Sequence, residues 1–162
     1  MADWRSRLAA LVRVGKNLPA PMNCFRARPP TRQGWPKSLP ACPALVEFYA
    51  LCDGGTFFWY DFFPLRRVKA EAAALRGWPD RPGDSSAQLR HLLLGYDPDS
   101  FALIWDSAKD ELVLFKADAQ SAYPRGVSFA AFVEELFAPK LAPGELENLW
   151  EATLLYLDGL AS

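Results

Sequence analysis

The side chains able to perform catalysis are few and scattered along this chain. His91 is the only histidine, so a histidine-dependent triad must use it, yet it lies among leucines in a predicted strand. There, a packed or hydrogen-bonded histidine is commoner than a general base. Ser85 and Ser86 lie in a loop without the G-x-S-x-G turn that exposes a nucleophilic serine. Glu134 and Glu135 are expected on a solvated helix face, so we predict no catalytic residues and no enzyme.

The spacing of the possible metal ligands along the chain does not indicate a metal site either. The three cysteines include no C-x-x-C pair, whereas structural zinc needs several ligands close together. Cys52 is expected on a buried helical stripe, where a free cysteine behaves as a small hydrophobe. The aspartates of two predicted turns lack the D-x-D-x-D-G pattern and the distant glutamate of a calcium loop. We therefore predict no metal and no cofactor.

Two further patterns resemble ligand-binding motifs and are better explained by structure. Gly54–Gly55 follows a predicted helix and precedes a predicted strand, the reverse of the order in phosphate-binding loops. The aromatic run 57–63 contains no basic residue and carries Asp61, whereas RNA-binding sheets interleave aromatic and basic side chains. Core packing or partner packing explains this run, and direct nucleic-acid binding is not predicted.

The elements before the centre of the chain follow from periodicity. Residues 2–14 are predicted as an amphipathic helix, and residues 16–43 as an irregular connection because seven prolines fall there. Phe25 and Trp35 suggest that this connection packs on the body. A helix over 43–52 ends at the two glycines. Then come an aromatic strand over 56–63, a short helix over 68–75 and a loop to about residue 86.

The rest of the chain predicts a β-meander followed by helices. Residues 89–95, 101–105 and 111–116 are apolar runs separated by turn sequences. Residues 128–137 and the segment from 146 to 157 repeat apolar residues at helical spacing. Strands in one block between helical blocks predict an α+β fold, a single domain over 1–162 with a central antiparallel sheet packed by N- and C-terminal helices.

Charge is unevenly distributed in this 162-residue chain of net charge −1. Residues 1–40 hold eight basic side chains and one acid, Asp3, leaving ten basic and eighteen acidic side chains for the remainder. We expect an acidic body with a basic N-terminal segment. No stretch approaches the roughly 20 apolar residues of a membrane helix, and the N-terminus lacks signal-peptide features. With three widely spaced cysteines, these features predict a cytoplasmic protein without membrane association.

The order of these motifs resembles the SUKH superfamily, which includes the SMI/KNR cell-wall regulators of yeast and many bacterial immunity proteins. Leu39–Pro40, the helix 43–49, Asp53–Gly54–Gly55 and the aromatic strand ending at Pro64–Leu65 are similar to its "lP…l…fY…nGg" unit. Residues 93–106 look like its "iG.d..Gd.l..D" meander, with Ser100 where a glycine is usual, and 128–137 look like its "sf.eFl" helix. The resemblance covers 39–137, leaving an N-terminal helix and Pro-rich basic arm (1–38) and a C-terminal helix (138–162) outside it.

The resemblance implies a non-enzymatic domain of SUKH-like fold. Bacterial relatives commonly neutralise a polymorphic toxin, often a nuclease or deaminase, by binding it, and an acidic surface suits a cationic nuclease. We expect a monomer or weak homodimer. A scaffold or regulatory adaptor using the Pro-rich segment 16–43 is the alternative. The candidate partner-binding residues combine aromatic anchors with steering carboxylates, or else are core and turn residues: Trp59, Tyr60, Asp61, Asp97, Asp99, Asp106, Asp110 and Glu111.

Overall fold

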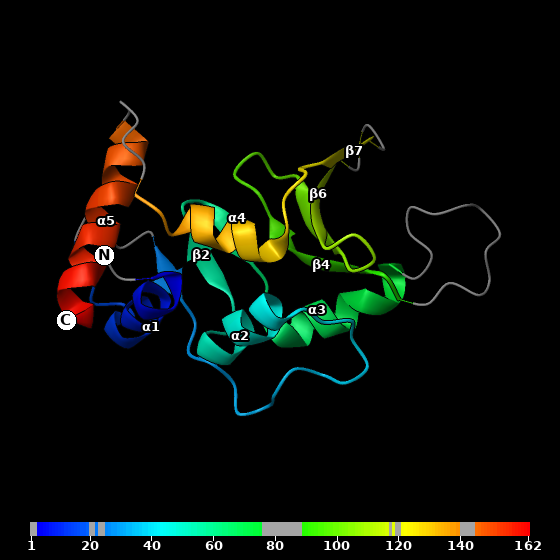
Figure 1. Ribbon diagram of the computed structural model, residues 1–162, viewed down its shortest axis with the longest axis horizontal. Helices are drawn as coiled ribbons and strands as arrows, with labels where there is room; N and C mark the ends of the chain where they lie inside the picture. The colour runs from blue at the N-terminus through cyan, green and yellow to red at the C-terminus, as the bar shows by residue number, and fades with distance from the viewer. Residues whose placement is uncertain are drawn as a thin grey trace.

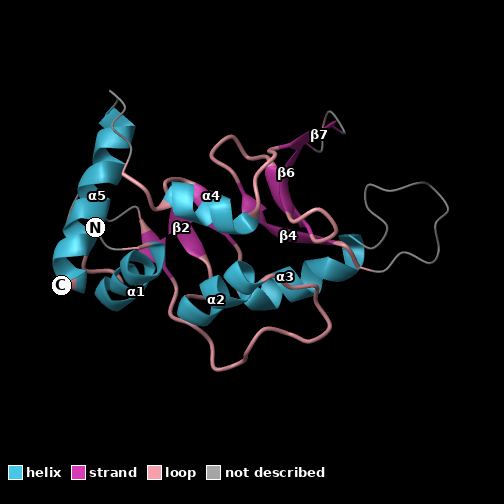
Figure 2. Cartoon of the chain, viewed as in Figure 1, coloured by secondary structure: helices cyan, strands magenta, loops and turns pink. Residues whose placement is uncertain are grey.

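Seven short strands form one antiparallel sheet in the computed structural model, which describes residues 3–19, 22, 25–75, 89–116, 118, 121–139 and 145–162. Each strand pairs with the next one along the chain, so the sheet is a continuous meander (Figure 2). The strands are β1 (Arg26–Ala27), β2 (Gly55–Phe57), β3 (Tyr60–Phe62), β4 (His91–Tyr96), β5 (Ala102–Asp106), β6 (Glu111–Lys116) and β7 (Ser121–Pro124).

Five α-helices and a 3-10 turn complete the described fold, so the α+β class expected from the sequence is confirmed. They are α1 (Trp4–Val14), α2 (Pro43–Leu51), α3 (Leu65–Ala72), η2 (Ala73–Leu75), α4 (Phe129–Leu136) and α5 (Glu145–Ala161). In Figure 1, α1 and α5 lie side by side at one end of the molecule, and α4 lies nearer the middle. None of the helices in the described ranges is long and apolar enough to cross a membrane.

The helix boundaries follow the local signals in the sequence. Asp3 caps α1 by accepting a hydrogen bond from the Ser6 amide, and Gly15 ends the helix with φ +58°. Pro43 occupies the first turn of α2, where a missing amide donor costs nothing. The predicted stripe of α2 is buried, with Phe48 and Cys52 fully inaccessible.

Aromatic side chains from distant segments meet in the core. The ring of Phe48 on α2 lies 5.9, 5.2 and 5.7 Å from the rings of Phe57, Phe62 and Phe129, between centroids. This packing joins α2, the β2–β3 hairpin and α4. Burial of each such ring stabilises the fold by about 1.5–3 kcal/mol relative to an exposed ring. The part of the chain that resembles the superfamily is thus built around one aromatic cluster.

The structure corrects the predicted single strand over 56–63. Gly55–Phe57 and Tyr60–Phe62 are two strands paired with each other, and the chain reverses between Phe57 and Tyr60. A two-residue reversal is normally marked by Asn-Gly or Asp-Gly. The aromatic residues Phe58 and Trp59 occupy the turn here, so no turn signal marks this reversal in the sequence.

The Pro-rich segment is also more ordered than predicted. It contains β1, which pairs with β2, and it buries Phe25 (1% exposed), Ala27 (7%) and Leu39 (8%). The expectation that Phe25 and Trp35 pack on the body is confirmed, since Trp35 lies 5.6 Å from the Tyr49 ring. β7 was not predicted, and the short helix begins at Leu65 rather than at residue 68. The predicted loop to residue 86 and Cys24 lie outside the described residues.

Candidate protein-binding surface

The tip of the β2–β3 hairpin has an unusual backbone. Phe58 and Trp59 both adopt left-handed conformations, with φ +49° and +63°. The pairing of Phe57 with Tyr60 leaves two residues for the reversal, and the mirror-image turn that suits a twisted hairpin requires positive φ at both. A left-handed non-glycine residue costs roughly 1–2 kcal/mol. Two consecutive bulky residues in this conformation are therefore a strained feature held by surrounding contacts.

Ring contacts hold the tip in place. Phe58 stacks on Trp150 of α5, with centroids 5.9 Å apart and planes at 26°. Trp59 meets the edge of Phe25 at 6.1 Å, yet 40% of its surface stays exposed. The tip therefore presents a tryptophan that is fixed by its neighbours and still reachable from solvent.

Tyr60 and Asp61 follow the tip on opposite faces of β3. Tyr60 packs edge-on against Phe132 of α4 at 5.2 Å and is half-buried, and this burial raises the pKa of its phenol. Asp61 is half-buried and lies directly opposite Tyr96 in β4. Tyr96, 37% exposed, was missed from the sequence, although its position just before the Asp97–Pro98 turn places it at a strand end.

Asp97 and Asp99 lie in the β4–β5 turn. The Asp97 Oδ1 accepts hydrogen bonds from the amides of Asp99 (3.0 Å) and Phe101 (2.8 Å), and Asp97 is only 8% exposed. Ser100 has φ +67°, so it takes the left-handed conformation that glycine adopts most easily. Asp99 remains exposed.

Asp106 is a buried structural carboxylate. It is 4% exposed and accepts hydrogen bonds from Arg90 Nε and Nη2, both at 2.7 Å, and from the Ala108 amide at 3.0 Å. Burial alone would raise the pKa of Asp106, but the Arg90 guanidinium and the Ala108 amide outweigh it and hold this pKa below its usual value. Asp106 thus secures the start of the β5–β6 turn.

The neighbouring acidic residues of this turn also accept hydrogen bonds from the protein. Asp110 accepts a hydrogen bond from Trp105 Nε1 at 2.9 Å, and Glu111 accepts one from the Gly126 amide at 2.9 Å. These contacts tie the turn to the sheet and to the segment that leads into α4. The side chain of Asp110 stays exposed, and Glu111 is half-buried.

The eight candidate residues do not form one patch. Strand register places Asp61 beside Tyr96, next to the Asp97 turn, whereas Asp106 pairs with His91 and Glu111 at the other end of the meander. Asp97 and Asp106 are buried, so a partner cannot use them as principal contacts. The exposed members near the first end are Trp59 and Asp99, with half-buried Asp61.

Of the groups considered for chemistry, Glu134 and Glu135 are exposed, Ser85 and Ser86 lie outside the described residues, and His91 and the described cysteines are buried or half-buried. His91 is 3% exposed, and its Nε2 lies 3.7 Å from Asp106 Oδ2, so it is sealed within the fold. Burial raises the pKa of the Cys52 thiol to about 12 and also raises that of half-buried Cys42. Among the described residues, no group of three or more His, Cys, Asp or Glu side chains is placed to hold a metal ion.

No family model, curated protein or solved structure matches this chain. The resemblance to the SUKH superfamily accordingly rests on the motifs of the sequence.

Proposed function

We propose that this chain is a non-catalytic protein-binding domain of the immunity type, which neutralises a cognate bacterial toxin by direct binding. The observation that carries the proposal is the strained, exposed tryptophan at the β2–β3 tip. Strained backbone persists where the surrounding structure enforces it and is concentrated at functional sites. Tryptophan is the residue most enriched among binding hot spots. The superfamily resemblance supports the class of partner, a polymorphic toxin of the nuclease or deaminase type.

The surface around the tip suits such a partner. Trp59 supplies apolar area without side-chain ordering on binding, because Phe25 already holds its ring. Asp61 and Asp99 place negative charge near the tip and would speed association with a cationic partner. Asp110 and Glu111 lie at the other end of the meander and stand in this proposal as secondary contacts.

Co-expression with each toxin gene found beside this gene tests the proposal. The wild-type chain should rescue growth and co-purify with one toxin. Trp59→Ala should weaken that complex by about thirtyfold or more, the effect of losing a hot spot worth about 2 kcal/mol. Tyr123→Ala is the matched control, since Tyr123 is 50% exposed on the edge strand β7 and should be replaceable without loss. If no neighbouring toxin is rescued or bound, the proposal fails.

The alternative function is that of an adaptor that docks its partner through the Pro-rich segment 16–43. Deleting that segment cannot test this alternative. Phe25, Ala27 and Leu39 are core residues, and β1 is part of the sheet. Deletion would unfold the domain and abolish all binding for a trivial reason. Substitutions of exposed residues of the segment are required instead.

A further inference from the structure

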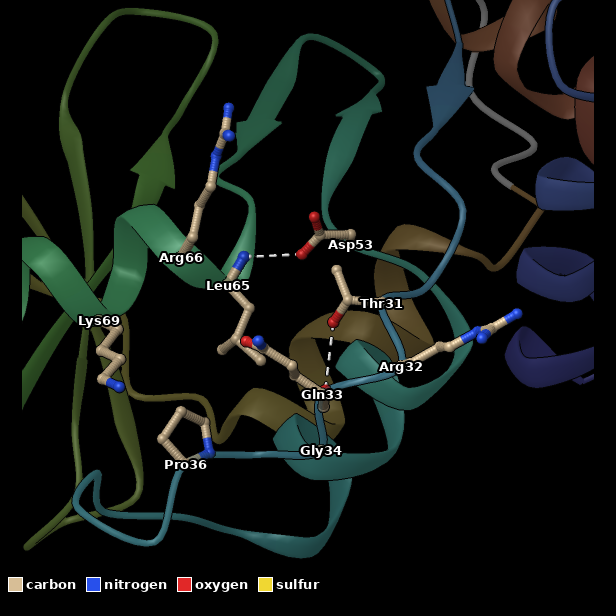
Figure 3. A pocket seen from close by; sticks show the side chains of 9 residues that line it. All are labelled: Thr31, Arg32, Gln33, Gly34, Pro36, Asp53, Leu65, Arg66 and Lys69. Atoms are coloured by element: carbon tan, nitrogen blue, oxygen red, sulfur yellow. Dashed lines mark hydrogen bonds between the residues drawn. The ribbon is translucent and has the colours of Figure 1, made fainter.

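A cavity of about 420 Å³ lies between the Pro-rich segment and α3, and none of the eight candidate residues lines it (Figure 3). One wall is the chain from Thr31 to Pro36, and the other comes from the start of α3. Three basic side chains line it, Arg32 from the segment and Arg66 and Lys69 from α3.

These three cations are uncommitted among the described residues. Arg32, Arg66 and Lys69 are exposed and form no ion pair or hydrogen bond with a described residue. Arg28 and Arg67 nearby differ, since Arg28 donates to the Phe62 carbonyl at 2.9 Å and Arg67 lies 3.6 Å above the Phe63 ring. Free positive charge is thus concentrated at this cavity.

Little negative charge offsets the cations. The sequence has no acid between Asp3 and Glu47, so the Pro-rich wall carries none. The one carboxylate in the lining, Asp53, is half-buried, and its Oδ1 accepts a hydrogen bond from the Leu65 amide at 2.7 Å. Asp53 is therefore engaged in capping α3, and the opening favours an anionic ligand.

The wall formed by the segment also offers backbone donors. The amides of Arg32, Gln33, Gly34 and Trp35 donate to no group of a described residue. An ideal Cβ built on Gly34 meets nothing within 4 Å, so the space beside this backbone is open. Free amides beside a cavity can donate hydrogen bonds to the backbone carbonyls of a bound peptide.

The directions in which the basic side chains point indicate which kind of anion can bind at this cavity. Figure 3 shows the guanidinium groups of Arg32 and Arg66 reaching outward from the two walls rather than converging on one point. A compact anion such as phosphate needs convergent donors. Charges spread around an opening suit carboxylates spaced along a chain, and the lining has no aromatic ring on which a nucleic-acid base would stack.

We infer that this cavity binds an acidic, extended segment of a partner protein, with its carboxylates at Arg32, Arg66 and Lys69 and its backbone along residues 32–35. This inference does not rest on the toxin-binding role of Trp59. It assigns a second binding surface of opposite charge character.

Fluorescence anisotropy of the full chain with a labelled hexapeptide of alternating Glu and Val tests this inference. Binding should be detectable at low ionic strength and weaken as salt is added. The double variant Arg66→Glu/Lys69→Glu should lose at least about tenfold in affinity, because two attractive charges become repulsive. Lys109→Glu, an exposed reversal in the β5–β6 turn, should change affinity by less than about twofold. Thermal unfolding confirms that each variant folds.

Gly34→Ala distinguishes binding at a defined site from non-specific attraction between opposite charges. The added methyl meets nothing in the free protein, so the fold is unaffected, but it enters the proposed peptide path and should weaken binding about threefold or more. Trp59→Ala should leave peptide binding intact, which distinguishes this surface from the hairpin tip. The inference is overturned if the peptide does not bind, if Gly34→Ala binds like wild type, or if a single-stranded oligonucleotide binds as tightly and shows the same response to every variant.

Discussion

Arg7 and Asp158 form a buried ion pair between α1 and α5. Arg7 is 2% exposed, and its Nε and Nη2 donate to the two Asp158 carboxylate oxygens at 2.7 and 2.8 Å. Its Nη1 donates to the Phe137 carbonyl at the end of α4. One guanidinium thus fastens both terminal helices, which lie outside the part resembling the superfamily, to the central body.

Asp158→Asn should therefore destabilise the protein strongly. The change leaves a guanidinium enclosed without its counter-charge, and breaking a fully buried pair costs about 3–5 kcal/mol. The Asp158 side chain is 22% exposed, so solvent screens part of the loss and we expect the lower end, about 3 kcal/mol. For a chain of this size, that corresponds to a fall in the unfolding midpoint temperature of roughly 6–12 °C.

Urea unfolding followed by tryptophan fluorescence measures this cost. Arg7→Met should also destabilise, and the double variant Arg7→Met/Asp158→Asn should lose less than the sum of the single changes, because each single change leaves the other charge unpaired. Arg5→Ala is the matched control on the same helix. Its exposed pair with Glu47, at 2.6 Å, should leave the urea midpoint almost unchanged. A loss below about 1 kcal/mol for Asp158→Asn would refute the reasoning, since it would show a solvent-screened pair.

Three further outcomes follow from titratable and backbone groups. The pKa of Asp106 is lowered in the fold, so the ionised carboxylate stabilises the folded protein above the unfolded pKa of about 3.9, and this stabilisation is lost as the pH falls through the folded pKa. Asp106→Asn should therefore be less stable than wild type at pH 7. Chemical unfolding at a series of pH values should show this difference in stability disappearing in acid. Alkylation at pH 8 with mass-spectrometric mapping should leave Cys52, whose pKa is about 12, unmodified in the native state, with Cys42 modified faster. Gly159→Ala should stabilise α5 by about 0.5–1 kcal/mol in urea unfolding, because the new methyl meets nothing within 4 Å and alanine favours a helix.

The sequence predicted the fold wherever one local signal agreed with one element. The stripe of Leu45, Phe48 and Cys52, the proline at the start of α2 and the serine cap of α4 each specified a helix correctly. The meander was recognised because apolar runs alternate with turn residues. The bounds of its strands shift by one or two residues, and a bulge between Leu93 and Gly95 contributes to the irregularity.

Elements that depend on tertiary contacts were not predictable in the same way. β1 is two residues long and exists because Arg26 and Ala27 pair with β2, which no local pattern reveals. The turn at Phe58 and Trp59 contradicts turn preferences and is held by Phe25 and Trp150, two residues more than 120 positions apart. Similarly, Asp106 looked like a solvated turn acid, and only its pairing with Arg90 made it a buried one.

The distribution of charge on the folded domain differs from what the count of charged residues along the chain suggests. The acidic body suggested a surface for a cationic partner, but Asp97, Asp106, Asp110 and Glu111 all accept hydrogen bonds from their own chain. Of these four, Asp106 is neutralised by the Arg90 guanidinium and so contributes least to steering, whereas the other three accept from neutral N–H groups and keep their negative charge. The cations at the α3 cavity have no such internal partner among the described residues.

Phe25 contacts one of the two proposed surfaces directly, and the chain leads from it toward the other. Its ring touches Trp59 at the hairpin tip and Trp150 on α5, and its backbone leads directly into β1 and then toward the wall of the cavity. If the two surfaces bind different partners, Phe25→Leu should weaken binding at Trp59 more than at the cavity, because the leucine cannot reproduce the edge contact that fixes the tryptophan ring.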